Sequence, residues 1–113
     1  MNLPQVNNDF DFDEFVQEML AKAEENIDAE NYSLATETLT LLTEKDPINV
    51  NARKLKAKIQ RQDAEGKKFR EAQALETQGK NGEALGIYKS LVESPKYGEL
   101  AKVKVKAQTK SVV

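Results

Sequence analysis

The chain has 113 residues, of which 32% are charged and only 6% aromatic, so its length suits one domain with a mainly aliphatic core. It contains no cysteine and no histidine. This excludes disulfides and zinc ribbons and removes the commonest general base and metal ligand. The sequence has no apolar run long enough to cross a bilayer and no visible signal peptide. We therefore expect a cytoplasmic protein without membrane insertion.

The net charge of −2 conceals a polarity along the chain. Residues 1–48 carry twelve acids and two bases, whereas residues 49–113 carry seven acids and fifteen bases. Such a polarity indicates electrostatic contact between the two halves, between copies, or with a charged partner.

Residues 8–15 read NDFDFDEF, which fits either an acidic-aromatic recognition motif or the start of a helix. With Asp11 as the N-cap, Glu14 completes an acidic capping box, and Phe10 and Phe15 take the two positions of a hydrophobic staple. We favour the helix start. Residues 1–10 are then expected to form a flexible lead.

Two helices are predicted in the first half of the chain. Apolar residues recur at three- and four-residue steps from the Asp11 cap to Ile27, which predicts a first helix of about five turns. A second is predicted from about Tyr32 to Glu44, and Asp46-Pro47 ends it because a residue before proline is disfavoured in the α region.

Three further helices are predicted after residue 48. Asn49 or Asn51 caps the third, whose apolar period continues through Gly66 as far as Leu75, so that one helix of about thirty residues is compatible with the pattern. The turn at 78–82 precedes a fourth helix over 83–92. The last segment, 97–108, contains a Val-Lys-Val-Lys alternation, but no strand is predicted to pair with it, which favours a helix. The predicted core comprises Phe15, Leu20, Ile27, Leu39, Leu42, Leu55, Ile59, Phe69, Leu75, Tyr88 and Leu91.

Two segments, residues 15–48 and 65–96, share a pattern. Each has a small residue on its first helix, a turn, and then alanine with a large residue four positions later. Each ends with a proline eleven or twelve residues after that alanine. The matched positions are Ala23, Ala35, Leu39 and Pro47 in the first segment, and Ala72, Ala84, Tyr88 and Pro95 in the second. The pattern resembles the tetratricopeptide repeat, a helix–turn–helix unit of 34 residues.

The resemblance implies an all-α fold of antiparallel hairpins over residues 11–109, as a single domain that binds other proteins. The chain departs from the family in two ways. Lys22, Lys68 and Glu71 stand where the family usually has large apolar residues, and Ala35 and Ala84 lie 49 rather than 34 residues apart. The extra 15 residues amount to about four helical turns, so either the third helix is lengthened or an additional helix intervenes.

Catalysis and metal binding are not expected. The many acids are not accompanied by histidine, cysteine or a glycine-rich phosphate loop. Asp9, Asp11 and Asp13 alternate like the start of a calcium loop, but Leu20 stands where the bidentate acid would be. We therefore predict a protein that is not an enzyme and uses no metal or cofactor.

The candidate partner-binding residues form a basic series in the third helix: Arg53, Lys54, Lys58, Arg61, Lys67, Lys68 and Arg70. Lys54, Lys58 and Arg61 would share one helical face, and the last three would extend it. Such a series can follow phosphates, but a pI near 5.3 disfavours nucleic acid. The alternative is a solvated helix face, in contact with the acidic first hairpin.

These patterns favour a non-enzymatic protein-interaction module, such as an adaptor or an assembly chaperone, whose partner is a protein or peptide that could be acidic. One alternative is a homo-oligomer that pairs the acidic N-terminal hairpin with the basic long helix. Another is a nucleic-acid-binding accessory protein using residues 53–70. The final residues, Lys110 to Val113, also fit the short C-terminal ligand pattern of PDZ domains.

Overall fold

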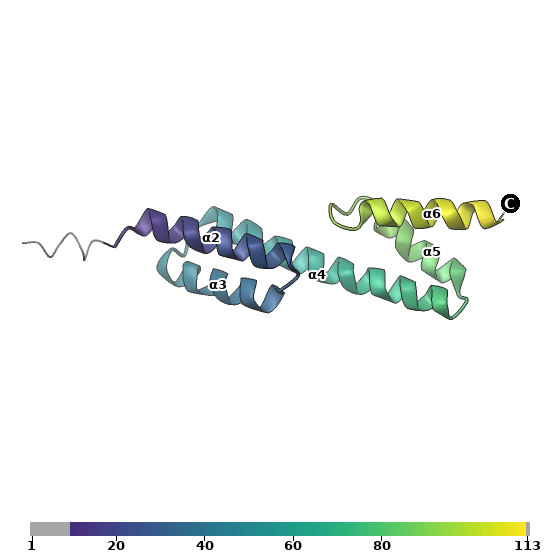
Figure 1. The fold of residues 1–113 in the computed structure, drawn as a ribbon, viewed down its shortest axis with the longest axis horizontal. Coiled ribbons are helices and arrows are strands. Elements are labelled where there is room, and N and C mark those ends of the chain that lie inside the picture. The colour runs from purple at the N-terminus through teal and green to yellow at the C-terminus, as the bar shows by residue number, and fades with distance from the viewer. Residues whose placement is uncertain (1–9, 113) are drawn as a thin grey trace, which may run out of the picture. The chain divides into compact units, whose positions relative to one another are not determined.

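The computed structural model describes residues 10–112, and the side chains of residues 10–109. Within residues 10–112 it has five α-helices and no strand, which confirms the predicted all-α class (Figure 1). The helices are α2 (Phe12–Asp28), α3 (Tyr32–Lys45), α4 (Val50–Thr77), α5 (Asn81–Ser90) and α6 (Gly98–Val112). Most of the predicted lead, and the terminal residue of the predicted PDZ ligand, lie outside the described residues.

The chain divides into two compact units, and the boundary between them along the sequence falls within α4. The first ends at Ile59 and the second begins at Gln60. We call them unit 1 and unit 2. The predicted single domain over residues 11–109 concerns how these units combine, and it stays a prediction.

The start of α2 confirms the helix-start interpretation of the opening stretch. The Asp11 carboxylate accepts a hydrogen bond from the Glu14 backbone N–H at 3.0 Å, so Asp11 is the N-cap. The rings of Phe10 and Phe15 lie 5.4 Å apart between centroids, as a hydrophobic staple requires. Asp13 and Glu14 in the first turn complement the positive end of the helix dipole.

The two hairpin turns have the same backbone geometry. In the turn from α2 to α3, Glu30 adopts a positive φ of 61°, and the Asn31 N–H donates to the Asn26 carbonyl at 2.7 Å. In the turn from α4 to α5, Gly79 has a φ of 80°, and the Lys80 N–H donates to the Leu75 carbonyl at 2.8 Å. Both are Schellman-type ends with one left-handed residue. Glu30 and Gly79 lie 49 residues apart, the offset of the predicted repeat.

In unit 1, α2 and α3 form a hairpin against which the first part of α4 packs. Its fully buried residues include two alanines twelve positions apart, Ala23 and Ala35, with Leu39 and Leu42 following on α3. The α4 residues Ala52, Leu55 and Ile59 belong to the same apolar cluster. Small residues at the helix contact let the backbones approach, and the leucines fill the space beside them.

Unit 2 repeats this arrangement with aromatic residues. Ala72 and Ala84 are fully buried and again lie twelve positions apart, and Tyr88 and Leu91 follow on α5. The Phe69 ring contacts Tyr88 edge-on at 5.6 Å and stacks on Tyr97 at 5.3 Å. Both units thus show the core positions predicted from the repeat. Of the eleven predicted core residues, nine are buried, and the exceptions, Phe15 and Leu75, are partly buried.

The extra residues between the hairpins lengthen the third helix. α4 has 28 residues and continues through Gly66 without a break. Gly66 also has a role in packing, because a Cβ at this position would lie 2.7 Å from the Tyr97 hydroxyl. The glycine therefore provides the space in which Tyr97, from the segment between α5 and α6, approaches α4.

Candidate functional site

A groove lies between α2 and the first part of α4, within unit 1. Its volume is about 400 Å³. Every residue that lines it belongs to unit 1: Gln17, Leu20, Ala21, Glu24, Asn51, Lys54 and Leu55.

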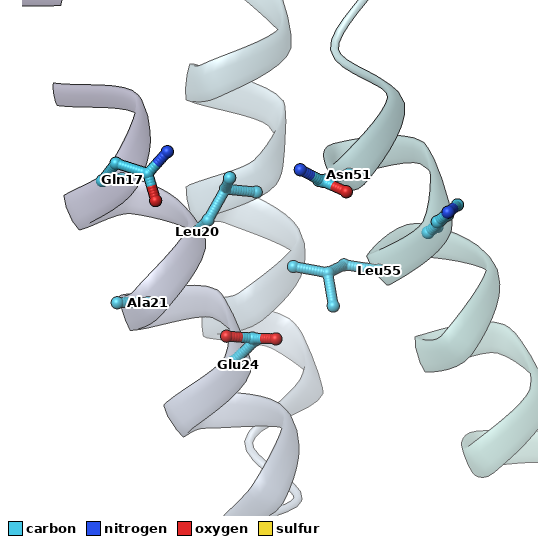
Figure 2. Close-up of a pocket in the computed structure, with 7 residues that line it drawn as sticks. Gln17, Leu20, Ala21, Glu24, Asn51 and Leu55 are labelled. Atoms are coloured by element: carbon cyan, nitrogen blue, oxygen red, sulfur yellow. The ribbon is translucent and has the colours of Figure 1, made fainter. Parts of the chain in front are cut away.

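The groove combines an apolar floor with a polar rim (Figure 2). Leu20 on α2 and Leu55 on α4 extend toward each other across the gap, and both are largely buried. Gln17 and Asn51 hold their amide groups at one end of the groove, and Glu24 lies farther along α2. Aliphatic floor residues bind apolar side chains, while the amides can donate to and accept from a peptide backbone.

Helix capping explains why Asn51 is available to the groove. The sequence left Asn49 and Asn51 as alternative caps of the third helix. In the structure the Asn49 side-chain oxygen accepts from the Ala52 N–H at 2.8 Å, and the Asn49 amide donates to Asp46 at 3.0 Å. Asn49 is therefore the cap. Asn51 lies in the first turn, and its exposed side chain lines the groove.

The seven predicted binding residues are divided between the two units. Arg53, Lys54 and Lys58 belong to unit 1, and the other four belong to unit 2. Lys54 is the member of the series that lines the groove. All are exposed except Lys58, which is partly buried.

The four basic residues of unit 2 do not form one face of α4. Successive residues of a helix are separated by about 100°, which puts Lys68 near the side of Arg61 and puts Arg70 opposite. Arg70 extends along Gly66, with its guanidinium 3.3 Å from the position of a Cβ there. Lys67 pairs with Asp63 at 3.6 Å. These four residues therefore wind around α4 and do not extend one basic face.

Sequence reasoning missed most of the groove, namely Gln17, Ala21, Glu24 and Asn51 as ligand-facing residues. The available signal was weak. Ala21 and Glu24 are small or charged residues on the exposed side of a predicted amphipathic helix, which is their usual place. Only the packing of α4 beside α2 turns this side into one wall of a groove.

Unit 2 has a polar network around Glu76 that joins α4, α5 and α6. The Glu76 carboxylate accepts from the Tyr88 hydroxyl at 2.7 Å, from the Lys104 ammonium at 3.1 Å and from the Gln108 amide at 3.0 Å. The hydrogen bond from Tyr88 is the main cause that lowers the pKa of Glu76, against the opposing effect of burial. Burial, and then the neighbouring carboxylate, raises the pKa of Tyr88.

The chemistry of this network fits a structural role. Tyr88 is fully buried in the unit 2 core, so its hydroxyl needs a hydrogen-bond acceptor, and Glu76 provides it. The raised pKa of the phenol disfavours the phenolate, and the lowered pKa of Glu76 keeps the carboxylate charged. Both shifts move these groups away from the range in which they would exchange protons near neutral pH.

Comparisons of the chain with family models, curated proteins and solved structures gave no match. Across residues 10–112, none of the helices combines the length and apolar character needed to cross a membrane. The same residues contain no group of three or more acidic side chains placed to hold a metal ion.

Proposed function

We propose that the chain is a non-enzymatic protein-interaction module that binds a peptide segment of another protein in the groove between α2 and α4. The observation that carries the proposal is the make-up of the groove, with Leu20 and Leu55 as its floor and amide side chains at its rim. A peptide has the same combination of apolar side chains and a hydrogen-bonding backbone. The tetratricopeptide-like pattern favours the same class of function.

The charges of the rim indicate which peptide fits. Lys54 lies on the α4 wall and Glu24 on the α2 wall. A peptide carboxylate is therefore favoured beside α4 and disfavoured beside α2. We propose a ligand with an aliphatic or aromatic anchor and an acidic residue next to it, which gives a more specific form of the acidic partner expected from the basic series.

Screening of an arrayed library of random peptides tests the proposal. We expect selected sequences to combine an apolar residue with an adjacent acid. In NMR titrations with a selected peptide, shifts should concentrate at the methyl groups of Leu20 and Leu55 and at the side-chain amides of Gln17 and Asn51.

Two alanine-to-arginine substitutions provide a matched pair. Ala21→Arg places a long side chain in the groove, and Ala57→Arg adds the same charge at an exposed position of α4 that does not line it. We expect Ala21→Arg to weaken peptide binding at least tenfold and Ala57→Arg to leave it nearly unchanged. Equal effects of the two variants, or a library that yields no ligand, would refute the proposal.

A further inference from the structure

Two surfaces outside the groove are exposed, partly apolar and opposite in charge. The first is the N-terminal ring cluster, which consists of Phe10, Phe12 and Phe15. Phe15 lies 5.4 Å from Phe10 and 6.4 Å from Phe12 between ring centroids. Phe10 is 65% exposed and Phe12 is 39% exposed, although large aromatic residues are normally buried.

The capping role explains only part of this cluster. The staple uses the contact between Phe10 and Phe15, and it does not require Phe12. Three acidic residues are interleaved with the rings, and all are exposed: Asp11, Asp13 and Glu14. The end of unit 1 therefore presents aromatic surface with negative charge around it.

The second surface is a hollow of about 300 Å³ on α6 and the segment before it, in unit 2. Its apolar residues are Val92, Val103 and Val105, and Val103 is 63% exposed. Lys102 and Lys106 line the same hollow. Glu99 also lines it and pairs with Lys102 at 3.5 Å. We call this surface the α6 hollow.

The chemistry of the two surfaces is complementary. A phenylalanine ring fits an aliphatic hollow, and carboxylates beside the ring would meet the ammonium groups of Lys102 and Lys106. A lysine can also lie over the face of an aromatic ring. The net charges of the two units are opposite in the same sense. Residues 1–59 carry twelve acids and six bases, while residues 60–113 carry seven acids and eleven bases.

We propose that the N-terminal ring cluster of one copy binds the α6 hollow of a second copy. The two surfaces differ, so the contact is heterologous. An assembly of such contacts has a free ring cluster at one end and a free α6 hollow at the other. The contact involves a few side chains on each partner, which places it among small, transient interfaces. Association is therefore expected to depend on protein concentration and to weaken with salt.

Sedimentation velocity with two complementary variants tests this arrangement. Phe10→Ser/Phe12→Ser removes the exposed rings and keeps the Asp11 cap. Val103→Glu places an acid in the hollow. We expect the mean mass of the natural chain to rise with concentration, and each variant alone to associate at least tenfold more weakly. An equimolar mixture of the variants should form a heterodimer and nothing larger, because one intact surface of each kind remains.

The control variant Leu34→Ser/Leu41→Ser removes exposed apolar surface from α3, at residues that belong to neither the ring cluster nor the lining of the α6 hollow. It should associate like the natural chain, and far-UV circular dichroism should show equal helicity in all variants. A natural chain that stays monomeric at millimolar concentration would overturn the proposal. This outcome includes a contact between the two surfaces within one copy, because such a contact also leaves the chain monomeric. A mixture that behaves like the separate variants would overturn it as well.

Discussion

Gly66 provides the sharpest test of the packing in unit 2. Replacement by alanine in a helix interior normally stabilises by about 1 kcal/mol, because glycine has more conformational freedom to lose. At Gly66 the new Cβ would lie 2.7 Å from the Tyr97 hydroxyl, where ordinary contact begins at 3.4 Å. The ring cannot move away freely, because Tyr97 is buried and stacked on Phe69.

The expected energy follows from these two opposing effects. Overpacking of a filled site costs about 1–3 kcal/mol, and the helix preference offsets about 1 kcal/mol of it. Gly66→Ala should therefore lower the free energy of unfolding by up to about 2 kcal/mol. Gly86 of α5 is the matched control, since a Cβ there meets nothing within 4 Å. Gly86→Ala should raise the free energy of unfolding by up to about 1 kcal/mol.

Urea unfolding followed by circular dichroism measures both variants, and a double-mutant cycle identifies the cause. Tyr97→Phe removes the hydroxyl and leaves the ring carbon Cζ, 3.5 Å from the new Cβ, as the nearest atom of that ring. In this background Gly66→Ala should lose most of its cost. Equal effects of Gly66→Ala and Gly86→Ala would refute the close-approach argument, and so would a cost that persists in the Tyr97→Phe background.

Three further predictions concern the core, the helix cap and the polar network. Leu39→Ala should lower the free energy of unfolding of unit 1 by about 2–5 kcal/mol, because Leu39 is fully buried, and a loss below about 0.5 kcal/mol in urea unfolding would contradict its place in the core. Asp11→Ala should cost about 1 kcal/mol in thermal unfolding through the lost cap and leave peptide binding in the groove intact. Glu76→Gln should cost about 1 kcal/mol near pH 7, because a neutral acceptor replaces a charged one, whereas exposed Glu83→Gln should have little effect. The folded pKa of Glu76 lies below its ordinary value of 4.5, so its contribution is present above pH 4.5 and is lost as the pH falls through the folded pKa. The stability difference between the natural chain and Glu76→Gln should therefore narrow in acid, and a difference that is constant down to pH 3 would contradict the assignment.

The repeat shows where sequence reasoning succeeded and where it stopped. The alanines at 23, 35, 72 and 84 are fully buried, as the pattern predicted. The equivalence of Glu30 and Gly79 was not recognised, because glutamate has no preference for the left-handed region that Gly79 adopts readily. Only the backbone shows that both hairpins end their first helix in the same way. The resemblance to tetratricopeptide repeats stays a prediction.

The sequence by itself determined the five helices, the Asp11 cap and the apolar positions of each hairpin. These features depend on interactions between residues close together in the chain: three- and four-residue periodicity, a carboxylate three positions before an N–H, and a residue before proline. The existence of the helices and most of the core were predictable for this reason, whereas the boundaries were approximate: the fourth helix, predicted over 83–92, is Asn81–Ser90, and the last, predicted over 97–108, is Gly98–Val112.

Tertiary structure decided the groove, the role of Gly66 and the Glu76 network. Each joins residues that are far apart in sequence, such as Leu20 with Leu55, Gly66 with Tyr97, and Glu76 with Gln108. A glycine in a helix, a glutamate on a polar face and an alanine at an exposed position have the same local pattern whether or not another helix packs beside them. Their function follows from the neighbour, and local periodicity does not specify which neighbour that is.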